Sequence, residues 1–316
     1  MPAGPGAAPP SGDDLVQPFM LESSGIRGNL VRLGSVAEAI ITGHGYPQPV
    51  GELLGELLAL TGVLSSMLKF DGVFALQAKG DGPVGMMVAD MTSQRRLRAY
   101  AGFDADKLTA VLRARRRARI RDRPGVPELL GSGYLACTVD EGVATERHQG
   151  IVELDGPSLA DCLQHYFRQC EQIQTGLVVA AGKPDGAWRA AGLILQRLPK
   201  SDQGSPGKAK PAYEDAWLRA MVLQASCTEA ELLDPKLPVH DLLYRLFHEE
   251  GVRVFRQRAL VAGCRCTRER LEETLRAMPR ERVEDLTIDG EVVVTCQFCN
   301  RDYRFDWAAL ERIYAP

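Results

Sequence analysis

The sequence has no strong excess of charge of either sign and no long apolar run. Its formal net charge is −3, so we expect no global attraction to nucleic acid or to an anionic membrane. No stretch approaches the roughly 18 consecutive apolar residues that a membrane span needs. Residues 1–15 lack the basic start and apolar run of a signal peptide, and their Pro, Gly and Ala content predicts a disordered tail. These features predict a cytoplasmic protein that does not enter a membrane.

Common catalytic patterns are missing as well. The sequence shows no Ser/His/Asp set, no phosphate-binding loop and no paired carboxylates, and its five histidines have no ligand spacing. What it does have is an ordinary globular composition, with 45% hydrophobic and 25% charged residues. A length of 316 residues suggests about two domains.

Residues 16–200 are expected to form an N-terminal core domain of mixed sheet and helix. Leucines at helical spacing predict a helix at Val50–Phe70, and two apolar runs around Gly80–Pro83 predict a β-hairpin. Leu97–Ala101 would continue this sheet. A second group of strands and a helix follows at Gly133–Val139, His148–Leu154, Ser158–Gln174, Leu177–Ala181 and Ala190–Gln196. Strands joined by short turns, with long helices between the groups, indicate an α+β fold rather than a doubly wound parallel sheet.

Residues 201–255 are expected to form a helical linker region. Ser201–Lys208 has the composition of a flexible linker, and three short helices are predicted after it, at Tyr213–Ala225, Thr228–Leu233 and Val239–Glu250. Thr228 and Glu231 match a capping box at the start of the middle helix. All three helices are predicted to be amphipathic, with apolar stripes formed by Trp217, Met221, Leu242, Leu243, Leu246 and Phe247. Helices this short are not stable alone in water, so we expect them to dock on another surface.

Residues 256–316 are expected to form a small C-terminal domain. A helix is predicted at Arg268–Met278, a strand at Val292–Thr295, and a closing helix at Trp307–Tyr314 with Asp306 as its N-cap. About 60 residues with few large apolar groups would form a marginal fold unaided. A bound metal would supply the missing stability.

Four cysteines in this last segment carry the strongest functional signal. They form two close pairs, Cys264 with Cys266 and Cys296 with Cys299, separated by 29 residues. Four thiolates have the number and type of ligands of a closed tetrahedral zinc site, and neighbouring positive charge favours the thiolate form. The nearby cations are Arg265, Arg268 and Arg301. Free dithiols or an iron–sulfur cluster remain alternatives, and the spacing alone favours a static structural zinc over a redox switch.

The other four cysteines are Cys137, Cys162, Cys170 and Cys227. They are scattered along the chain and have no close partner. Cys170 fits the apolar face of its predicted helix, where a buried cysteine acts as a small hydrophobe. We assign no role to these four residues.

An arginine-rich stretch lies in the middle of the core domain. Seven arginines occur within eleven residues: Arg113, Arg115, Arg116, Arg117, Arg119, Arg121 and Arg123. Such a run could bind nucleic acid or an acidic partner. It shares a predicted helix with apolar residues and has no interleaved aromatic residue for base stacking, so the favoured interpretation is a solvated helix face.

Residues along nearly the whole chain, apart from the N-terminal tail, resemble the 33 kDa heat shock protein family of redox-regulated bacterial chaperones. The shared pattern is Cys-x-Cys, about thirty residues, then Cys-x-x-Cys near the C-terminus. Leu243–Glu250 is similar to the family's linker helix, and Cys264–Arg270 and Val294–Cys299 are similar to its metal-site segments. Gly80–Pro83 and Gly192–Pro199 also occur in the expected order.

The resemblance implies a holdase that is not an enzyme. In the reduced state one Zn²⁺ would be bound by the four cysteines and the protein would be inactive. Oxidation would form disulfides Cys264–Cys266 and Cys296–Cys299, release zinc and unfold the C-terminal region. The activated protein would bind unfolding client proteins without ATP, and the family suggests that the oxidised form can dimerise. An exposed apolar set would contact clients: Trp217, Met221, Leu246 and Phe247.

Two other classes of function remain as alternatives. A zinc-ribbon module that binds nucleic acid has only the arginine-rich stretch in its favour, so we do not expect nucleic acid as a partner. A thiol oxidoreductase would use Cys296 and Cys299. In such enzymes the Cys-x-x-Cys motif usually opens a helix after a strand, whereas here Asn300–Asp302 and a predicted strand follow it.

Overall fold

The computed structural model describes residues 12–142, 148–169, 173–197, 210–285, 287 and 290–315. Its chain divides into two compact units, Met1–Ala262 and Gly263–Pro316. Three expectations fall outside the described residues: most of the predicted tail, the position of Cys170, and the flexible segment Ser201–Lys208.

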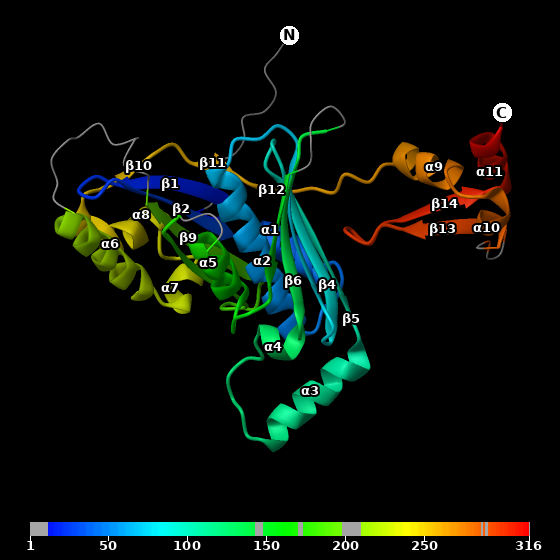
Figure 1. Cartoon of the computed structure of the whole chain (residues 1–316). Helices are drawn as coiled ribbons and strands as arrows, with labels where there is room; N and C mark the ends of the chain where they lie inside the picture. Colours follow the sequence, from blue (N-terminus) through cyan, green and yellow to red (C-terminus); the bar gives the residue numbers. More distant parts are fainter. Residues whose placement is uncertain are drawn as a thin grey trace, which may run out of the picture. The chain divides into compact units, whose positions relative to one another are not determined.

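Two sheets organise the larger unit (Figure 1). The first sheet has the strand order β10-β1-β2-β9-β8, and β11 also pairs with β1. Its strands are β1 Leu15–Leu21, β2 Ile26–Leu33, β8 Thr175–Gly182, β9 Arg189–Arg197, β10 Val252–Val254 and β11 Arg258–Ala259. The second has the order β12-β5-β4-β3-β6-β7; its strands are β3 Val73–Gly80, β4 Val84–Thr92, β5 Arg96–Phe103, β6 Gly133–Asp140, β7 His148–Glu153 and β12 Val261–Ala262. Neighbouring strands are antiparallel except that β12 runs parallel to β5. The fold class is α+β, as predicted.

Helix α2 (Gln48–Met67) lies between the two sheets (Figure 1). It is buried almost all round, because its leucines contact side chains of both sheets in one hydrophobic cluster. The short helix α1 (Ser35–Thr42) packs beside it, and α5 (Leu159–Gln169) adds to the same cluster. By length and mean hydropathy α2 could cross a membrane, but 83% of its most apolar window is buried inside the protein. This pattern is that of a core helix.

Three helices of the linker region cover the other face of the first sheet: α6 (Lys210–Ala225), α7 (Glu229–Leu233) and α8 (Val239–Phe247). The predicted docking of these helices is therefore confirmed, as is the capping box between Thr228 and Glu231. The prediction that all three are amphipathic is wrong for α6. This helix also exposes Leu218 and Val222 to solvent, so it has apolar residues on both faces.

Arg32 connects helices α6, α7 and α8, together called the linker layer, to the first sheet. It lies on β2 with 2% of its surface exposed, and its guanidinium donates to the backbone carbonyls of Glu231, Leu232 and Leu237. The carbonyls at the end of a helix have no intrahelical partner, so a buried arginine satisfies them and complements the negative end of the helix dipole. The sheet thus binds the α7–α8 connection through backbone atoms as well as apolar contacts.

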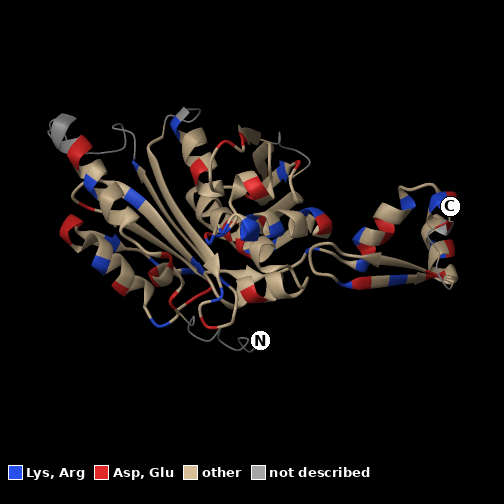
Figure 2. Cartoon of the chain, turned by 90° about the horizontal axis from the view of Figure 1, so that it is seen from below, with Lys and Arg blue, Asp and Glu red and all other residues tan. Residues whose placement is uncertain are grey.

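Helix α3 (Ala105–Arg117) contains the first part of the arginine-rich stretch (Figure 2). Asp104 caps its first turn by accepting from two backbone N–H groups. The helix ends at Arg117, whereas the sequence predicted one helix for the whole arginine run. It ends there because Arg119 adopts a left-handed conformation with φ of 57°, and the N–H of Ile120 then donates back to the carbonyl of Arg115. This is the Schellman arrangement of a helix C-terminus.

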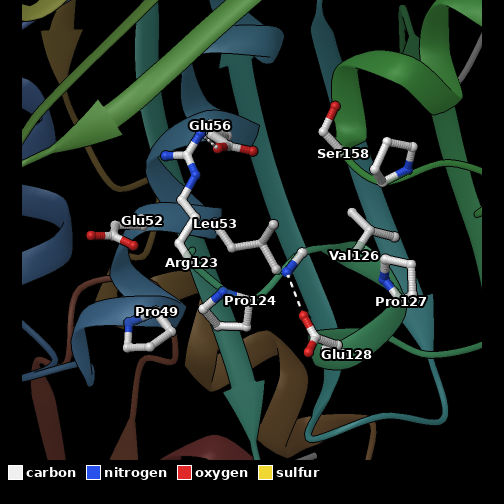
Figure 3. Close-up of a pocket in the computed structure, with 12 residues that line it drawn as sticks. Pro49, Glu52, Leu53, Glu56, Arg123, Pro124, Val126, Pro127, Glu128 and Ser158 are labelled. Carbon is white, nitrogen blue, oxygen red and sulfur yellow. Dashed lines mark hydrogen bonds and ion pairs between the residues drawn. The ribbon is translucent and has the colours of Figure 1, made fainter. Parts of the chain in front are cut away.

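A pocket of about 430 Å³ lies between α2 and the loop that follows α3 (Figure 3). The guanidinium of Arg123 reaches a carboxylate oxygen of Glu56 on α2 at 3.1 Å and one of Glu229 on α7 at 2.7 Å. Burial raises the pKa of Glu56 to about 7, although Arg123 opposes the shift. One arginine therefore joins the loop, the central helix and the linker layer.

Replacing Glu56 with glutamine is expected to stabilise the larger unit at pH 8 by up to about 3 kcal/mol. The folded protein holds the Glu56 proton more tightly than the unfolded chain, since burial raises its pKa from 4.5 to about 7. Stability of the native protein should therefore fall as pH rises from about 4.5 to 7, and Glu56→Gln should remove this dependence. Urea unfolding at pH 5 and pH 8, followed by Trp188 and Trp217 fluorescence, measures both effects. Glu52→Gln in the same pocket is the control, and an E56Q protein that is less stable at pH 8 would contradict the argument.

Candidate metal centre

The smaller unit contains the four cysteines and a modest core. Its elements are α9 Arg268–Arg276, α10 Arg280–Glu284, β13 Glu291–Thr295, β14 Asp302–Asp306 and α11 Trp307–Tyr314. The predicted closing helix and the Asp306 N-cap are confirmed. Its hydrophobic cluster has these buried members: Leu275, Val283, Val292, Phe305, Ala309, Leu310 and Ile313. So small a core among the described residues needs a further source of stability.

Cys296 and Cys299 lie in the turn between β13 and β14. The N–H of Cys296 donates to the carbonyl of Arg301 at 2.9 Å, and the N–H of Asn300 donates to the carbonyl of Cys296 at 2.8 Å. Asn300 has a φ of 54°, a left-handed conformation that asparagine tolerates better than most residues. The tight turn brings both sulfurs to one side. It is a hairpin turn and not the start of a helix, so the geometry does not favour a thiol oxidoreductase.

Cys264 and Cys266 lie in the segment before α9, which is neither helix nor strand, and meet the hairpin turn. The four sulfur atoms all lie within 4.8 Å of one another. Cys264 Sγ is 3.6 Å from Cys296 Sγ, and Cys266 Sγ is 3.3 Å from Cys299 Sγ. A tetrahedral zinc with bonds of about 2.3 Å has sulfurs about 3.8 Å apart. The four cysteines are thus close enough to hold a metal ion, and the donor set fits zinc.

The thiols influence one another's ionisation. Burial raises the pKa of Cys264, but hydrogen bonds from Cys266 and from the other thiols outweigh it and lower this pKa to about 7. Burial and hydrogen bonding to the other thiols raise the pKa of Cys299 to about 12. One thiolate is therefore readily formed, whereas four negative sulfurs at these distances need a compensating cation. A divalent metal ion supplies that charge.

Tyr303 on β14 is a contributor that sequence reasoning missed. Its hydroxyl lies 3.3 Å from both the sulfur and the carbonyl oxygen of Cys266. In the sequence, Tyr303 comes one residue after Asp302, the first residue of a hairpin strand, and this position was the available sign that its hydroxyl could reach the site.

Of the predicted cations, Arg301 interacts with Tyr303 and Cys299. Arg268 instead binds Glu272 and the carbonyl of Arg304.

Replacing Tyr303 with phenylalanine is expected to weaken metal binding by about tenfold, because outer partners that hydrogen-bond to ligands typically contribute 10–100-fold. Competition for zinc with a chromophoric chelator measures the change. Tyr314→Phe is the matched control, since the Tyr314 hydroxyl donates to the backbone carbonyls of Leu275 and Met278. Equal zinc affinity in Tyr303→Phe and the native protein would show that this hydroxyl does not act on the site.

The remaining cysteines differ from these four. Cys162 and Cys227 are buried, and burial raises the pKa of each thiol to about 11. They remain protonated near neutral pH, and protonated thiols bind metals and react with oxidants poorly. Cys137 is half-buried on β6. Among the described residues, the group that could hold a metal ion is the set of four cysteines in the smaller unit.

The candidate client-binding residues are brought together by the fold, but they are not exposed. Trp217 and Met221 on α6 and Leu246 and Phe247 on α8 belong to the cluster beneath the linker layer. Phe247 is fully buried, and its ring stacks on that of Phe19 with centroids 5.7 Å apart. Any role in binding clients would require these helices to leave the sheet.

Comparison with known proteins agrees with this arrangement. The family model described as Hsp33 protein matches residues 14–306. The chain belongs to the Hsp33 family. It is 38% identical over 306 residues to the 33 kDa chaperonin of Caulobacter vibrioides, covering 95% of this chain and 97% of that one. It is 36% identical over 305 residues to the 33 kDa chaperonin of Ectopseudomonas mendocina, covering 96% of each.

A solved structure shares the fold. The crystal structure of the 33 kDa chaperonin of Thermotoga maritima superposes with a TM-score of 0.77 at 20% identity, over 95% of this chain and 97% of that one. The predicted family resemblance is therefore confirmed. Membership supports chaperone function for this Hsp33 family member, since its curated relatives are named 33 kDa chaperonin.

Proposed function

We propose that this protein is a redox-regulated, ATP-independent holdase of the cytoplasm. The reduced form binds one Zn²⁺ through Cys264, Cys266, Cys296 and Cys299 and is inactive. Oxidation forms the disulfides Cys264–Cys266 and Cys296–Cys299, releases zinc and unfolds the C-terminal region. The linker region, residues 201–255, then leaves the sheet, and the exposed apolar surface binds unfolding clients.

The convergence of four thiols in a unit with a small core is the observation that supports this proposal. When such a site exists only in the folded state, the free energy of metal binding becomes folding free energy. Each disulfide forms from two thiols, which lose two electrons and two protons; hydrogen peroxide as oxidant takes both and gives two waters. The resulting disulfide sulfurs have lost the negative charge that binds the metal, so the metal's contribution to folding disappears.

Two sulfur–sulfur contacts of the reduced protein join the two cysteine segments. Cys264 Sγ lies 3.6 Å from Cys296 Sγ, and Cys266 Sγ lies 3.3 Å from Cys299 Sγ. The proposed disulfides instead link neighbours along the chain. These bonds leave the two segments free of each other, which is what allows the unit to unfold after oxidation.

The linker layer supplies the client surface in this proposal. Its buried side includes Trp217, Met221, Leu246 and Phe247, and detaching it would also expose the apolar face of the first sheet. Large exposed apolar surfaces bind unfolding proteins, and they also bind each other. Dimerisation of the oxidised form follows from the same property.

The test compares the zinc-loaded reduced protein with protein treated with peroxide at elevated temperature. Released zinc, free thiols and suppression of citrate synthase aggregation are measured on the same samples. We expect loss of four thiols and one zinc per chain together with a gain of anti-aggregation activity. The proposal is wrong if oxidation releases no zinc, or if the reduced form suppresses aggregation equally well.

A further inference from the structure

The segment formed by α3 and the turn after it, residues 105–123, is called the arginine arm here. Two of its seven arginines have structural partners: Arg115 pairs with Glu128, and Arg123 pairs with Glu56 and Glu229. The other five are exposed and make no ion pair or side-chain hydrogen bond with any residue that the structure describes: Arg113, Arg116, Arg117, Arg119 and Arg121. The fold therefore uses two of these cations and leaves five in solvent.

Helix geometry gathers three of the free arginines on one side. At 3.6 residues per turn, Arg113, Arg116 and Arg117 fall within an arc of about 100°. The opposite side of α3 contains the buried Leu108 and the anchored Arg115. No acidic residue occurs between positions 106 and 122. The outer face is thus a continuous positive stripe, which the turn with Arg119 and Arg121 extends.

The five free arginines of the arginine arm do not stabilise its fold. Arginines three and four residues apart on a helix repel each other and destabilise it. Arg119 occupies a left-handed position, φ 57°, where glycine is favoured. Attraction to the negative end of the helix dipole accounts for cations in the last turn, but that turn does not include Arg119 or Arg121. An exposed, self-repelling cluster is relieved when an anion binds.

We propose that the arginine arm binds the phosphate backbone of single-stranded nucleic acid without reading its sequence. Guanidinium groups match phosphate oxygens in pairs, and the arm has seven arginines but only one lysine, Lys107. A flexible strand can follow the stripe from α3 into the turn without a deformation cost, whereas a stiff duplex must be bent to do so. The arm has no aromatic residue, so base stacking contributes nothing. The overall charge of −3 does not oppose binding, because charges beyond about 8 Å are screened at physiological salt.

Fluorescence anisotropy with a labelled 20-nucleotide poly(U) RNA and the reduced, zinc-loaded full-length protein tests the proposal. Five phosphate contacts predict a slope of about −3.5 for log affinity against log salt concentration. The triple variant Arg113→Gln, Arg116→Gln, Arg117→Gln should bind at least tenfold more weakly at 50 mM salt, with a slope reduced by about 2. The control triple Arg168→Gln, Arg256→Gln, Arg312→Gln changes the net charge equally and should change affinity by less than twofold.

Folding defects are separated from binding by Arg119→Gly. Glycine relieves the left-handed backbone, so this variant should raise Tm and still weaken RNA binding several-fold. The proposal is overturned if the native protein does not bind the RNA at 50 mM salt, or if both triple variants lose affinity equally. It is also overturned if polyglutamate binds more tightly than RNA, since the arm would then recognise an acidic protein.

Discussion

Replacing Cys296 with serine is expected to unfold residues 263–316 in the reduced protein. The unit has a small buried core, and structural zinc sites contribute about 10–16 kcal/mol to folding. A serine hydroxyl is not a thiolate, so the variant loses one of four metal ligands and most of that contribution. Zinc content should fall from one per chain to near zero, and limited proteolysis should cut rapidly within residues 263–316.

The matched control is Cys137→Ser, which changes the same atom on β6 of the larger unit. It should retain one zinc per chain and keep the smaller unit resistant to protease. Under the proposed function, Cys296→Ser should also suppress citrate synthase aggregation without oxidant. Stoichiometric zinc and an intact smaller unit in Cys296→Ser would mean that apolar packing alone maintains its fold.

The sequence predicted best those elements whose signals are local. The leucine pattern of α2, the turn at Gly80–Pro83 and the caps at Thr228 and Asp306 all correspond to the structure. Each depends on residues within a few positions of one another. Boundaries were less accurate: α2 ends at Met67 and not at Phe70, since Leu68 is already extended.

Strands β1 and β2 were not predicted, although they are central to the first sheet. Pro18 interrupts the middle of β1, and a proline normally argues against an interior strand. β2 contains the polar residues Asn29 and Arg32, yet both are buried. Arg32 is tolerated because the linker helices, some 200 positions later, supply carbonyls for its guanidinium. Partners so distant in sequence leave no local pattern.

At the metal site, too, local sequence signals were predictive and contacts between distant segments were not. Residue type and spacing identified all four cysteines that the structure brings together. The spacing did not reveal that Cys264 faces Cys296 and Cys266 faces Cys299, nor that the Tyr303 hydroxyl reaches Cys266. Those contacts depend on how the hairpin packs against the segment that contains Cys264 and Cys266.

Phe247→Ala is expected to activate the reduced protein without loss of zinc. Phe247 is fully buried under the linker layer and stacks on Phe19. Truncating a buried phenylalanine costs about 3–5 kcal/mol, and here the cost falls on the contact between α8 and the sheet. If docking of the linker helices keeps the client surface covered, the variant should bind a hydrophobic dye and suppress citrate synthase aggregation while still holding one zinc.

Tyr244→Ala is the matched control, because it removes an aromatic ring from the same helix at a position that is 65% exposed. Tyr244→Ala should leave both dye binding and the suppression of citrate synthase aggregation unchanged. Arg32→Met provides an independent route, since it removes the three bonds to the α7–α8 connection and leaves the apolar side chains of the layer in place. If both Phe247→Ala and Arg32→Met lower Tm while the reduced protein stays inactive, the linker layer is not what covers the client surface. If the variants are instead active and retain zinc, the linker layer is what covers the client surface, and the metal centre controls that surface through the linker layer.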